Sequence, residues 1–159
     1  MNILITNDDG VQAPGLLVLK QALEKVGVVV VVAPDQNWSA GGHVKTLHKP
    51  LRLSEVKLAD GSEAYASSGA PSDCVALVLL GAINFTPDLI VSGINPNSNL
   101  SHDVTYSGTV TAAMEGALEG VPSIAVSVES AEAYEQAAQF AARLTQIVAK
   151  HGLPRGVLL

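Results

Sequence analysis

The sequence predicts an α/β fold in which helices cover both faces of a mainly parallel sheet. Short continuous apolar runs alternate along the chain with segments whose apolar residues recur at helical spacing. Strands of a parallel sheet give such continuous runs, because the helices of the crossover connections bury both faces. The 159 residues, 48% hydrophobic and 15% charged, suffice for one full core. We therefore expect a single domain over residues 1–159.

The first elements follow from these patterns in order. Residues 3–5 are an apolar strand, and the polar turn 7–10 ends it. A helix is expected over residues 14–26, because it opens with Pro-Gly, its leucines recur at helical spacing and a glycine follows. The β-branched run at residues 28–32 is the next buried strand.

The pattern changes to alternation in the segment "VKTLHKPLRLSEVKLADG". Alternating apolar and polar residues are typical of a strand with one buried face. We therefore expect residues 43–61 to form an antiparallel β-hairpin or arm that projects from the main sheet and reaches toward a partner subunit.

The second half of the chain continues the alternation of strands and helices. Strands are expected at residues 64–67, 89–92 and 123–128, and helices at 72–82, 108–119 and 131–150. A long loop spans 95–106. The final "RGVLL" reads as the start of one more core strand.

Charge and cysteine content narrow the function classes. The formal net charge of -6 repels polyanions, so binding to duplex nucleic acid or to an anionic membrane is not expected. The longest apolar runs fall short of the roughly 20 residues that span a bilayer. A single cysteine, Cys74, cannot form an internal disulfide, and the N-terminus lacks a leader-like pattern. A cytoplasmic location is expected.

Four polar stretches fall at the ends of predicted strands or at the start of a helix. They are "NDD" at 7–9, "PDQNWSAGG" at 34–42, "SGIN" at 92–95 and "YSGTV" at 106–110. Ligands of open parallel sheets bind beyond the carboxyl ends of the strands. If the strands are neighbours, these stretches converge on one crevice.

Two adjacent carboxylates, Asp8 and Asp9, follow the first strand. Like charges side by side raise each other's free energy unless a positive or hydrogen-bond-donating group meets them. With a serine hydroxyl and an asparagine carbonyl, the pair would form an all-oxygen shell that suits Mg²⁺ or Mn²⁺ better than Zn²⁺. The alternative is that the aspartates cap the next helix or shape a turn.

The stretch "YSGTVTAAMEG" places Ser107, Gly108 and Thr109 at a helix N-terminus. Free N–H groups and the helix dipole favour an anion there, and a phosphate fits. The alternative is ordinary capping by a hydroxyl. Asn37 could touch a metal or a phosphate, or only shape its turn. Neither G-x-G-x-x-G nor G-x-x-x-x-G-K-[ST] occurs, which disfavours dinucleotide and P-loop nucleotide binding.

Five motifs in this order resemble the SurE family of stationary-phase survival proteins. They are "NDDG", "APDQNWSAGG", "GAPSDCV", "SGIN" followed by "NL" and "D", and "YSGTVTAAMEG", and they lie within residues 2–128. The resemblance implies a three-layer, Rossmann-like α/β/α sandwich that assembles as a homodimer or homotetramer through exchanged arms. It also implies a metal-dependent nucleotidase that removes phosphate from nucleoside monophosphates.

The resemblance also implies which residues carry the chemistry. One divalent cation per subunit, Mg²⁺ or Mn²⁺, is expected on Asp8, Asp9, Ser39 and Asn95, and the substrate phosphate on Asn37, Ser107, Gly108 and Thr109. The chain departs from the family in three places. Asn97 and Ser101 stand where glycines are usual, and Ala70 where a threonine is usual. The family's C-terminal segment after "GVLL" is expected to be missing.

Hydrolysis of a phosphomonoester by a metal-activated water is the mechanism that these residues favour, with Asp8 or Asp9 as proton acceptor. A receiver-like or phosphate-sensing domain that binds Mg²⁺ without turnover is the alternative. Receivers need a phosphoacceptor Asp and a Lys at later strand ends, which this chain lacks. A haloacid-dehalogenase-type phosphatase needs Asp-x-Asp, whereas these aspartates are adjacent. An inactive subunit that serves assembly is a third possibility.

Overall fold

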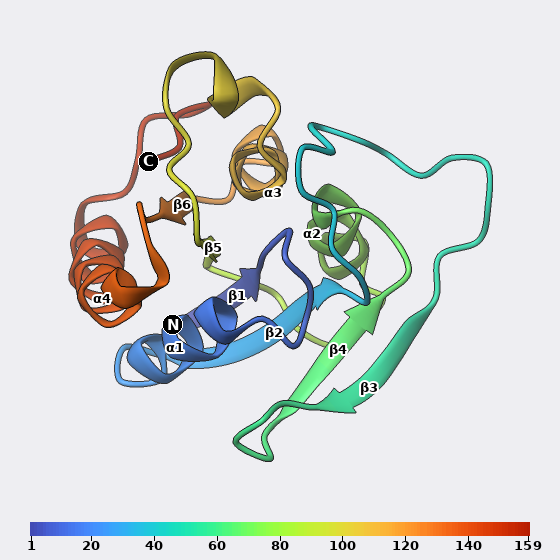
Figure 1. The fold of residues 1–159 in the computed structure, drawn as a ribbon, viewed down its shortest axis with the longest axis horizontal. Helices are drawn as coiled ribbons and strands as arrows, with labels where there is room; N and C mark the ends of the chain where they lie inside the picture. The colour runs from blue at the N-terminus through green and yellow to red at the C-terminus, as the bar shows by residue number, and fades with distance from the viewer.

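The computed structural model describes residues 1–159, in which six strands form one sheet in the order β3-β4-β2-β1-β5-β6 (Figure 1). The strands are β1 (Asn2–Thr6), β2 (Val28–Pro34), β3 (Leu53–Lys57), β4 (Glu63–Ser67), β5 (Leu89–Asn95) and β6 (Ser123–Ser127). The helices are α1 (Pro14–Leu23), α2 (Pro71–Leu79), α3 (Gly108–Leu118) and α4 (Tyr134–His151), with two 3₁₀ turns, η1 (Ser101–Thr105) and η2 (Ala131–Ala133). Only the β3–β4 pair is antiparallel. The predicted α/β class and mainly parallel sheet are confirmed.

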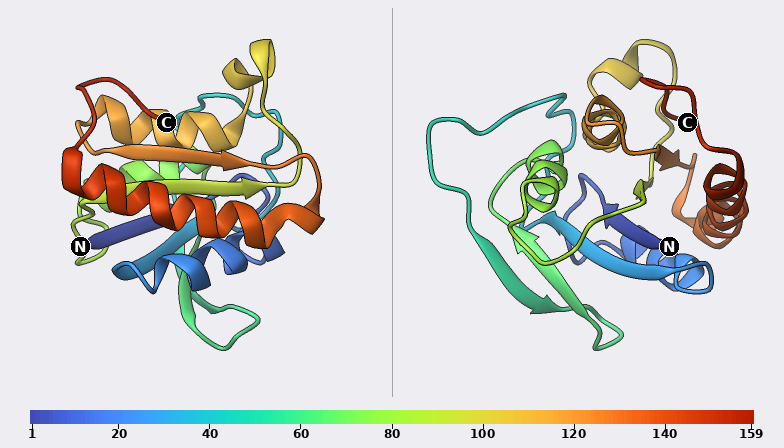
Figure 2. Two further views of the ribbon diagram at one scale, coloured as in Figure 1. Left: turned by 90° about the vertical axis from the view of Figure 1, so that its left-hand side faces the viewer. Right: turned by 180° about the vertical axis from the view of Figure 1, so that it is seen from behind.

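Helices α1 and α4 cover one face of the sheet, and α2 and α3 cover the other (Figures 1 and 2). Successive residues of β1 point to opposite faces, so Ile3 and Ile5 pack in the core under α1 and α4 while Leu4 packs under α2 and α3. All three side chains are fully buried. The three-layer sandwich is therefore confirmed, and its central strand is buried on both faces.

The strand order creates a switch point between β1 and β5. The five parallel strands lie in the order third, second, first, fourth, fifth along the chain. The chain therefore leaves β1 toward one edge of the sheet and later returns to the opposite side of β1. The crevice outside the carboxyl ends at such a point is where open α/β sheets bind ligands.

The predicted hairpin is shorter than expected. Its strands are β3 and β4, joined by a projecting turn at residues 58–62, whereas residues 35–52 contain no helix or strand. The prediction was wrong for residues 43–52, because polar groups of that stretch bond to side chains of α2 and α3 instead of to a neighbouring strand. Thr46 N–H donates to Asp73, and Pro50 has no N–H to offer a ladder.

Other boundaries also differ from the predictions. The helix α1 ends at Leu23 rather than at residue 26, and α2 at Leu79 rather than at residue 82. The final "RGVLL" forms no strand, although Leu159 N–H donates to Ser123 O at 3.1 Å and Leu159 O accepts from Ala125 N–H at 2.7 Å. Only the last residue thus pairs with β6.

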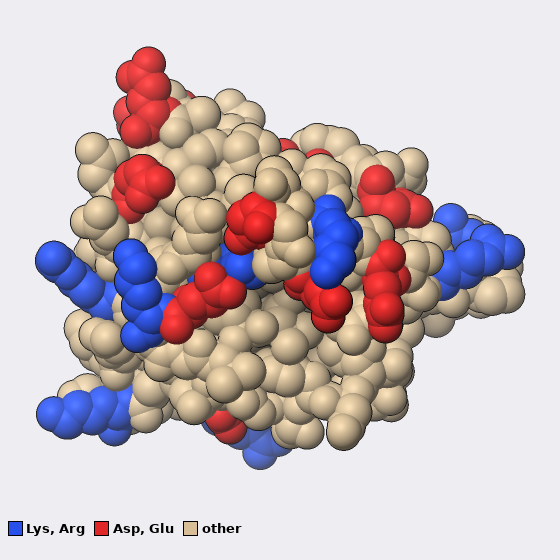
Figure 3. Space-filling view, turned by 90° about the horizontal axis from the view of Figure 1, so that it is seen from below, with Lys and Arg blue, Asp and Glu red and all other residues tan.

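Acidic and basic side chains are interspersed on the face of the molecule shown in Figure 3. An ion pair with a buried lysine ties the projecting turn to α1: Lys20 Nζ lies 3.2 Å from Oδ2 of the exposed Asp60. None of the helices combines the length and the apolar character needed to cross a membrane.

A substitution at Gly15 tests how closely α1 approaches the end of β5. A Cβ at this position would lie 2.4 Å from Ile94 O, a backbone atom that cannot rotate away. Gly15→Ala should therefore lower the free energy of unfolding by about 1–3 kcal/mol, although helix propensity alone would favour Ala by about 1 kcal/mol. Urea unfolding measures the difference. Gln21→Ala, exposed on the same helix, is the control; equal or higher stability of Gly15→Ala would contradict the close approach.

Candidate functional site

A polar cavity of about 230 Å³ lies at the carboxyl ends of β1 and β5. Four of the predicted site residues line it: Asp8, Ser39, Asn95 and Ser107. Three cavities are larger, of about 530, 350 and 340 Å³, and none of them has a pair of carboxylates in its wall. The predicted convergence of loops therefore identifies the smaller cavity as the chemically distinctive one.

Asp8 is the buried centre of the site. It lies two residues beyond β1 and is 3% exposed. Its Oδ1 accepts the hydroxyl hydrogen of Thr109 at 2.5 Å. A Cβ on Gly108 would lie 2.7 Å from Asp8 Cβ, so only glycine allows α3 to begin this close to the carboxylate. The first turn of α3 is thus packed directly on Asp8.

The loop after β1 owes its shape to Asn7 rather than to the aspartates. Asn7 Nδ2 donates to Gly10 O at 3.0 Å, and Gly10 N–H donates to Asn7 Oδ1 at 3.2 Å. Gly10 has a φ of 106°, a left-handed conformation that favours glycine. The N-cap of α1 is Ala13, with no side-chain cap. The alternative that Asp8 and Asp9 cap this helix is therefore wrong.

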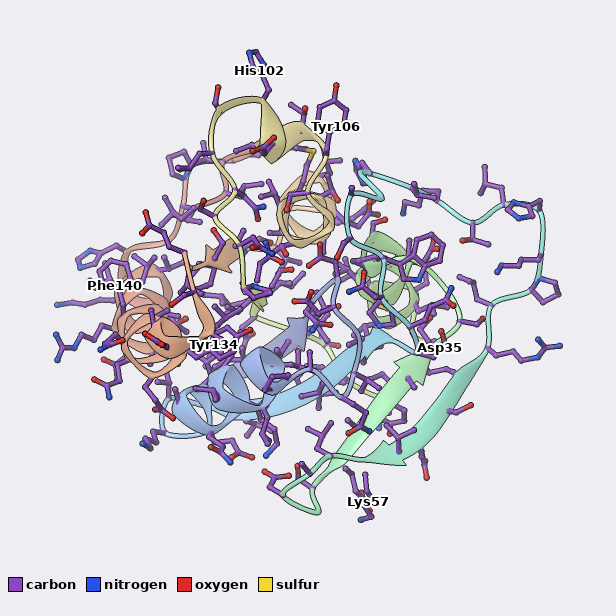
Figure 4. All side chains as sticks on the ribbon, in the orientation of Figure 1. Asp35, Lys57, His102, Tyr106, Tyr134 and Phe140 are labelled. Carbon is purple, nitrogen blue, oxygen red and sulfur yellow. The ribbon has the colours of Figure 1, made fainter.

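Asp9 lies apart from the cavity wall, half-buried near the start of α4. Burial, and after it the neighbouring charge of Asp8, raises the pKa of Asp9 from 3.8 to about 6. Burial and then the charge of Asp9 raise the pKa of Tyr134, which begins α4 and is labelled in Figure 4. The carboxylate form of Asp9 is thus unfavourable in the absence of a cation.

The amide side chains present defined atoms to a ligand. Asn95 Nδ2 donates to Asn97 O at 2.6 Å, which leaves its Oδ1 free to accept or to coordinate. Asn37 has the opposite arrangement: its Oδ1 accepts Ser39 N–H at 2.8 Å, which leaves its Nδ2 free to donate. An oxygen ligand suits a cation and an N–H donor suits an anion. Asn37 is exposed and does not line the cavity.

The first turn of α3 offers backbone donors rather than hydroxyls. Ser107 is the N-cap: its Oγ accepts Val110 N–H at 3.2 Å and donates to Asn99 at 2.8 Å. The hydroxyl hydrogen of Thr109 is used by Asp8. The N–H groups of Gly108 and Thr109 have no intrahelical acceptor, because they belong to the first turn. Capping by Ser107 is therefore confirmed, whereas Gly108 and Thr109 are buried and do not line the cavity.

Six residues of the cavity wall were not predicted as site residues, and two of them, Asp103 and Tyr106, add a carboxylate and an aromatic ring. Both lie in the predicted loop 95–106, which contains η1; Tyr106 is 64% exposed beside α3 in Figure 4. The carboxylate of Asp103 and the ring of Tyr106, shortly before the Ser-Gly-Thr stretch, were the features from which their place in the site could have been predicted. In the same loop Ser101, which replaces a glycine usual in the family that the motifs resemble, keeps a left-handed φ of 54°.

The donor set fits a hard divalent cation. No group of three or more His, Cys, Asp or Glu side chains gathers in the structure. The cavity wall contains Asp8 and Asp103 but no Lys, Arg or His. Carboxylate, hydroxyl and amide oxygens around uncompensated negative charge are the environment that Mg²⁺ and Mn²⁺ prefer.

Fold and cavity together define a Rossmann-like α/β protein with an acidic, oxygen-lined site at its switch point. Residues 3–159 match the family model described as "Survival protein SurE", and the chain belongs to this family. It is 55% identical to the "5'-nucleotidase SurE" of Herpetosiphon aurantiacus and 52% identical to that of Chloroflexus aggregans, with all of this chain and 64% of each relative covered.

A solved structure agrees with the sequence comparison. The SurE protein from Aquifex aeolicus superposes with a TM-score of 0.84 at 41% sequence identity, over 98% of this chain and 62% of that chain. The chain thus spans somewhat less than two thirds of the length of these relatives.

Asp9 gives a test that needs no substrate. The pKa of Asp9 is about 6 in the folded chain and near 4 when unfolded, so its ionisation destabilises the fold as pH rises from about 4 to 6 and the full penalty persists above 6. With EDTA present, Asp9→Asn should therefore have a higher thermal midpoint than the wild type at pH 7.5. This difference in thermal midpoint should shrink as the pH is lowered toward 4. A difference that does not change with pH, or no difference at pH 7.5, would contradict the burial of this charge.

Proposed function

We propose that this chain is a metal-dependent phosphomonoester hydrolase that acts on nucleoside monophosphates. The observation that carries the proposal is the contact of Asp8 with the first turn of α3, beside Ser39 and Asn95. It sets a cation-binding carboxylate next to N–H groups suited to a phosphate. The name of the relatives, "5'-nucleotidase SurE", supports a nucleotide as substrate.

One Mg²⁺ or Mn²⁺ per chain would be held by Asp8, Asp9, Ser39 and Asn95. When bound, such a cation lowers the pKa of a water and polarises a phosphoryl oxygen. The fixed Oδ1 of Asn95 offers a neutral oxygen ligand, and the Asp8 and Asp9 pair offers the charge. Asp9 does not line the cavity, and the family resemblance is what supports its place among the cation ligands.

Groups of the protein itself would bind the phosphate, accept the proton and orient the other groups of the site. The N–H groups of Gly108 and Thr109, with the free Nδ2 of Asn37, would bind the phosphate and stabilise negative charge that develops on its oxygens. Asp8 or Asp9 would accept a proton from the attacking water. The hydroxyls of Ser107 and Thr109 would act by orientation, since their hydrogens bond Asn99 and Asp8.

Assembly and location are part of the proposal. The family resemblance supports a homodimer or homotetramer, and the single buried cysteine suits the reducing cytoplasm. A net charge of -6 disfavours binding to duplex nucleic acid and to anionic membranes.

The receiver-like alternative is disfavoured by topology. Receivers of the CheY type have the strand order 2-1-3-4-5, whereas the parallel strands of this sheet follow 3-2-1-4-5. The end of the strand on the far side of β1 carries Asn95 where a phosphoacceptor aspartate would be needed. Binding without turnover thus has less support than hydrolysis.

Phosphate release from a panel of nucleoside monophosphates tests the proposal. With Mn²⁺ or Mg²⁺ the wild type should release phosphate, and EDTA should stop the release. Asp8→Asn should lose at least about 100-fold in turnover, because the charge of a cation ligand is lost, while the far-UV spectrum stays unchanged.

Asp35→Asn is the matched control. Asp35 is exposed at the same edge of the sheet, after β2, and does not line the cavity (Figure 4). It should keep wild-type turnover. Retained turnover in Asp8→Asn, or release that EDTA leaves unchanged, would remove the acidic pair and the cation from the mechanism.

A further inference from the structure

A buried carboxylate outside the cavity holds the loop that carries Ser39. Glu115 lies on α3, two turns beyond the Ser-Gly-Thr stretch, and is 4% exposed. Its Oε2 is hydrogen-bonded to His43 Nε2 at 2.8 Å, and its Oε1 is paired with Lys45 Nζ. Both partners come from the irregular segment 35–52, which passes beside α3 and α2 in Figure 1.

A second buried carboxylate continues this attachment on α2. Asp73 is 3% exposed and accepts two hydrogen bonds from Thr46, from N–H at 3.0 Å and from the hydroxyl at 2.6 Å. Ser72 donates its hydroxyl hydrogen to Val44 O. Residues 43–46 are thus attached to two helices, whereas Leu47, the next residue, is 89% exposed.

Ser39 lies in a short stretch that is fixed at both ends. Trp38 N–H donates to Asp8 O at 2.7 Å on one side. On the other side Gly42 N–H donates to Tyr106 O at 2.9 Å, and Gly42 O accepts from Thr111 at 3.0 Å. These contacts connect Ser39 both to the carboxylate loop and to the N-terminal half of α3.

The backbone of this stretch needs such support. Ala40, next to Ser39, has a φ of 58°, a left-handed conformation that side-chain-bearing residues rarely adopt. Conformations of this kind persist only where surrounding contacts hold them. If residues 43–45 moved away, Glu115 would be left as a buried charge without a partner, which is strongly unfavourable. Glu115 therefore opposes release of the loop.

We propose that Glu115 is a positioning residue of the site. Through His43 and Lys45 it keeps residues 38–42 in the conformation that directs Ser39 into the cavity, and it thereby sets the affinity for a divalent cation. The inference rests on the proposed function only where that function assigns Ser39 to the cation. Glu115 itself does not line the cavity.

The single tryptophan of the chain makes the inference measurable without turnover. Trp38 adjoins Ser39, so its fluorescence reports the state of this stretch. Glu115→Gln should raise acrylamide quenching of Trp38 and should weaken Mn²⁺ binding, followed by calorimetry, by about 10- to 100-fold, the range found when outer partners of metal ligands are removed.

Two further variants separate positioning from general destabilisation. Glu119→Gln, an exposed change at the end of the same helix, should leave quenching and Mn²⁺ affinity unchanged. In a Ser39→Ala background Glu115→Gln should weaken Mn²⁺ binding little further, because residues that act through one another are not additive. A full additional loss in that background would overturn the inference.

Lys45→Met keeps the proposal testable if Glu115→Gln does not fold. Lys45 has a side chain 42% exposed and lies outside helices and strands, so its loss should weaken Mn²⁺ binding in the same direction without unfolding α3. A folded Glu115→Gln or Lys45→Met with wild-type affinity and quenching would overturn the inference. A wild type that binds Mn²⁺ without releasing phosphate would refute the proposed hydrolase instead, and these affinities would still decide the role of Glu115.

Discussion

The direct packing of the first turn of α3 on Asp8 is the constraint on which the rest of the site depends. It is possible only because Gly108 lacks a Cβ, which would lie 2.7 Å from that of Asp8. The close approach continues along the helix, since a Cβ on Gly116 would lie 2.4 Å from Ile90 Cδ1. Small residues on one side of α3 thus bring its N-terminus and the end of β1 together, and the cavity forms where they meet.

The buried and half-buried carboxylates of α2, α3 and the loop after β1 differ in how many donors they receive. Asp73 and Glu115 are fully provided with donors from the segment 35–52. The aspartates after β1 are not: Asp8 has one hydroxyl donor, and Asp9 carries a raised pKa. Buried charge without compensation costs stability, and folded chains keep it mainly where a ligand is to supply the balance.

The sequence predicted most of the sheet and much of the cavity, because both follow from local patterns. Continuous apolar runs indicated the buried strands. Polar residues at the ends of these strands come together beside the switch point, where open α/β sheets bind ligands. The hairpin boundary could not be predicted, since His43 and Lys45 alternate like a strand but bond to a helix 70 residues away. Asn95 also depends on an irregular pairing of β5 with β6 between Ser92 and Asn95, for which no local pattern exists.

The loops of the site are hydrogen-bonded to one another as well as within themselves. Asp8 joins the end of β1 to α3 through Thr109, and its carbonyl receives the N–H of Trp38 from the loop after β2. Ser107 bonds Asn99 of the loop after β5. Because each link crosses between separate segments of the chain, loosening one loop removes support from the others. The side chains of Asp8 and Asn95 are therefore held in place by contacts within the protein, and such preorganisation lowers the entropic cost of binding a ligand between them.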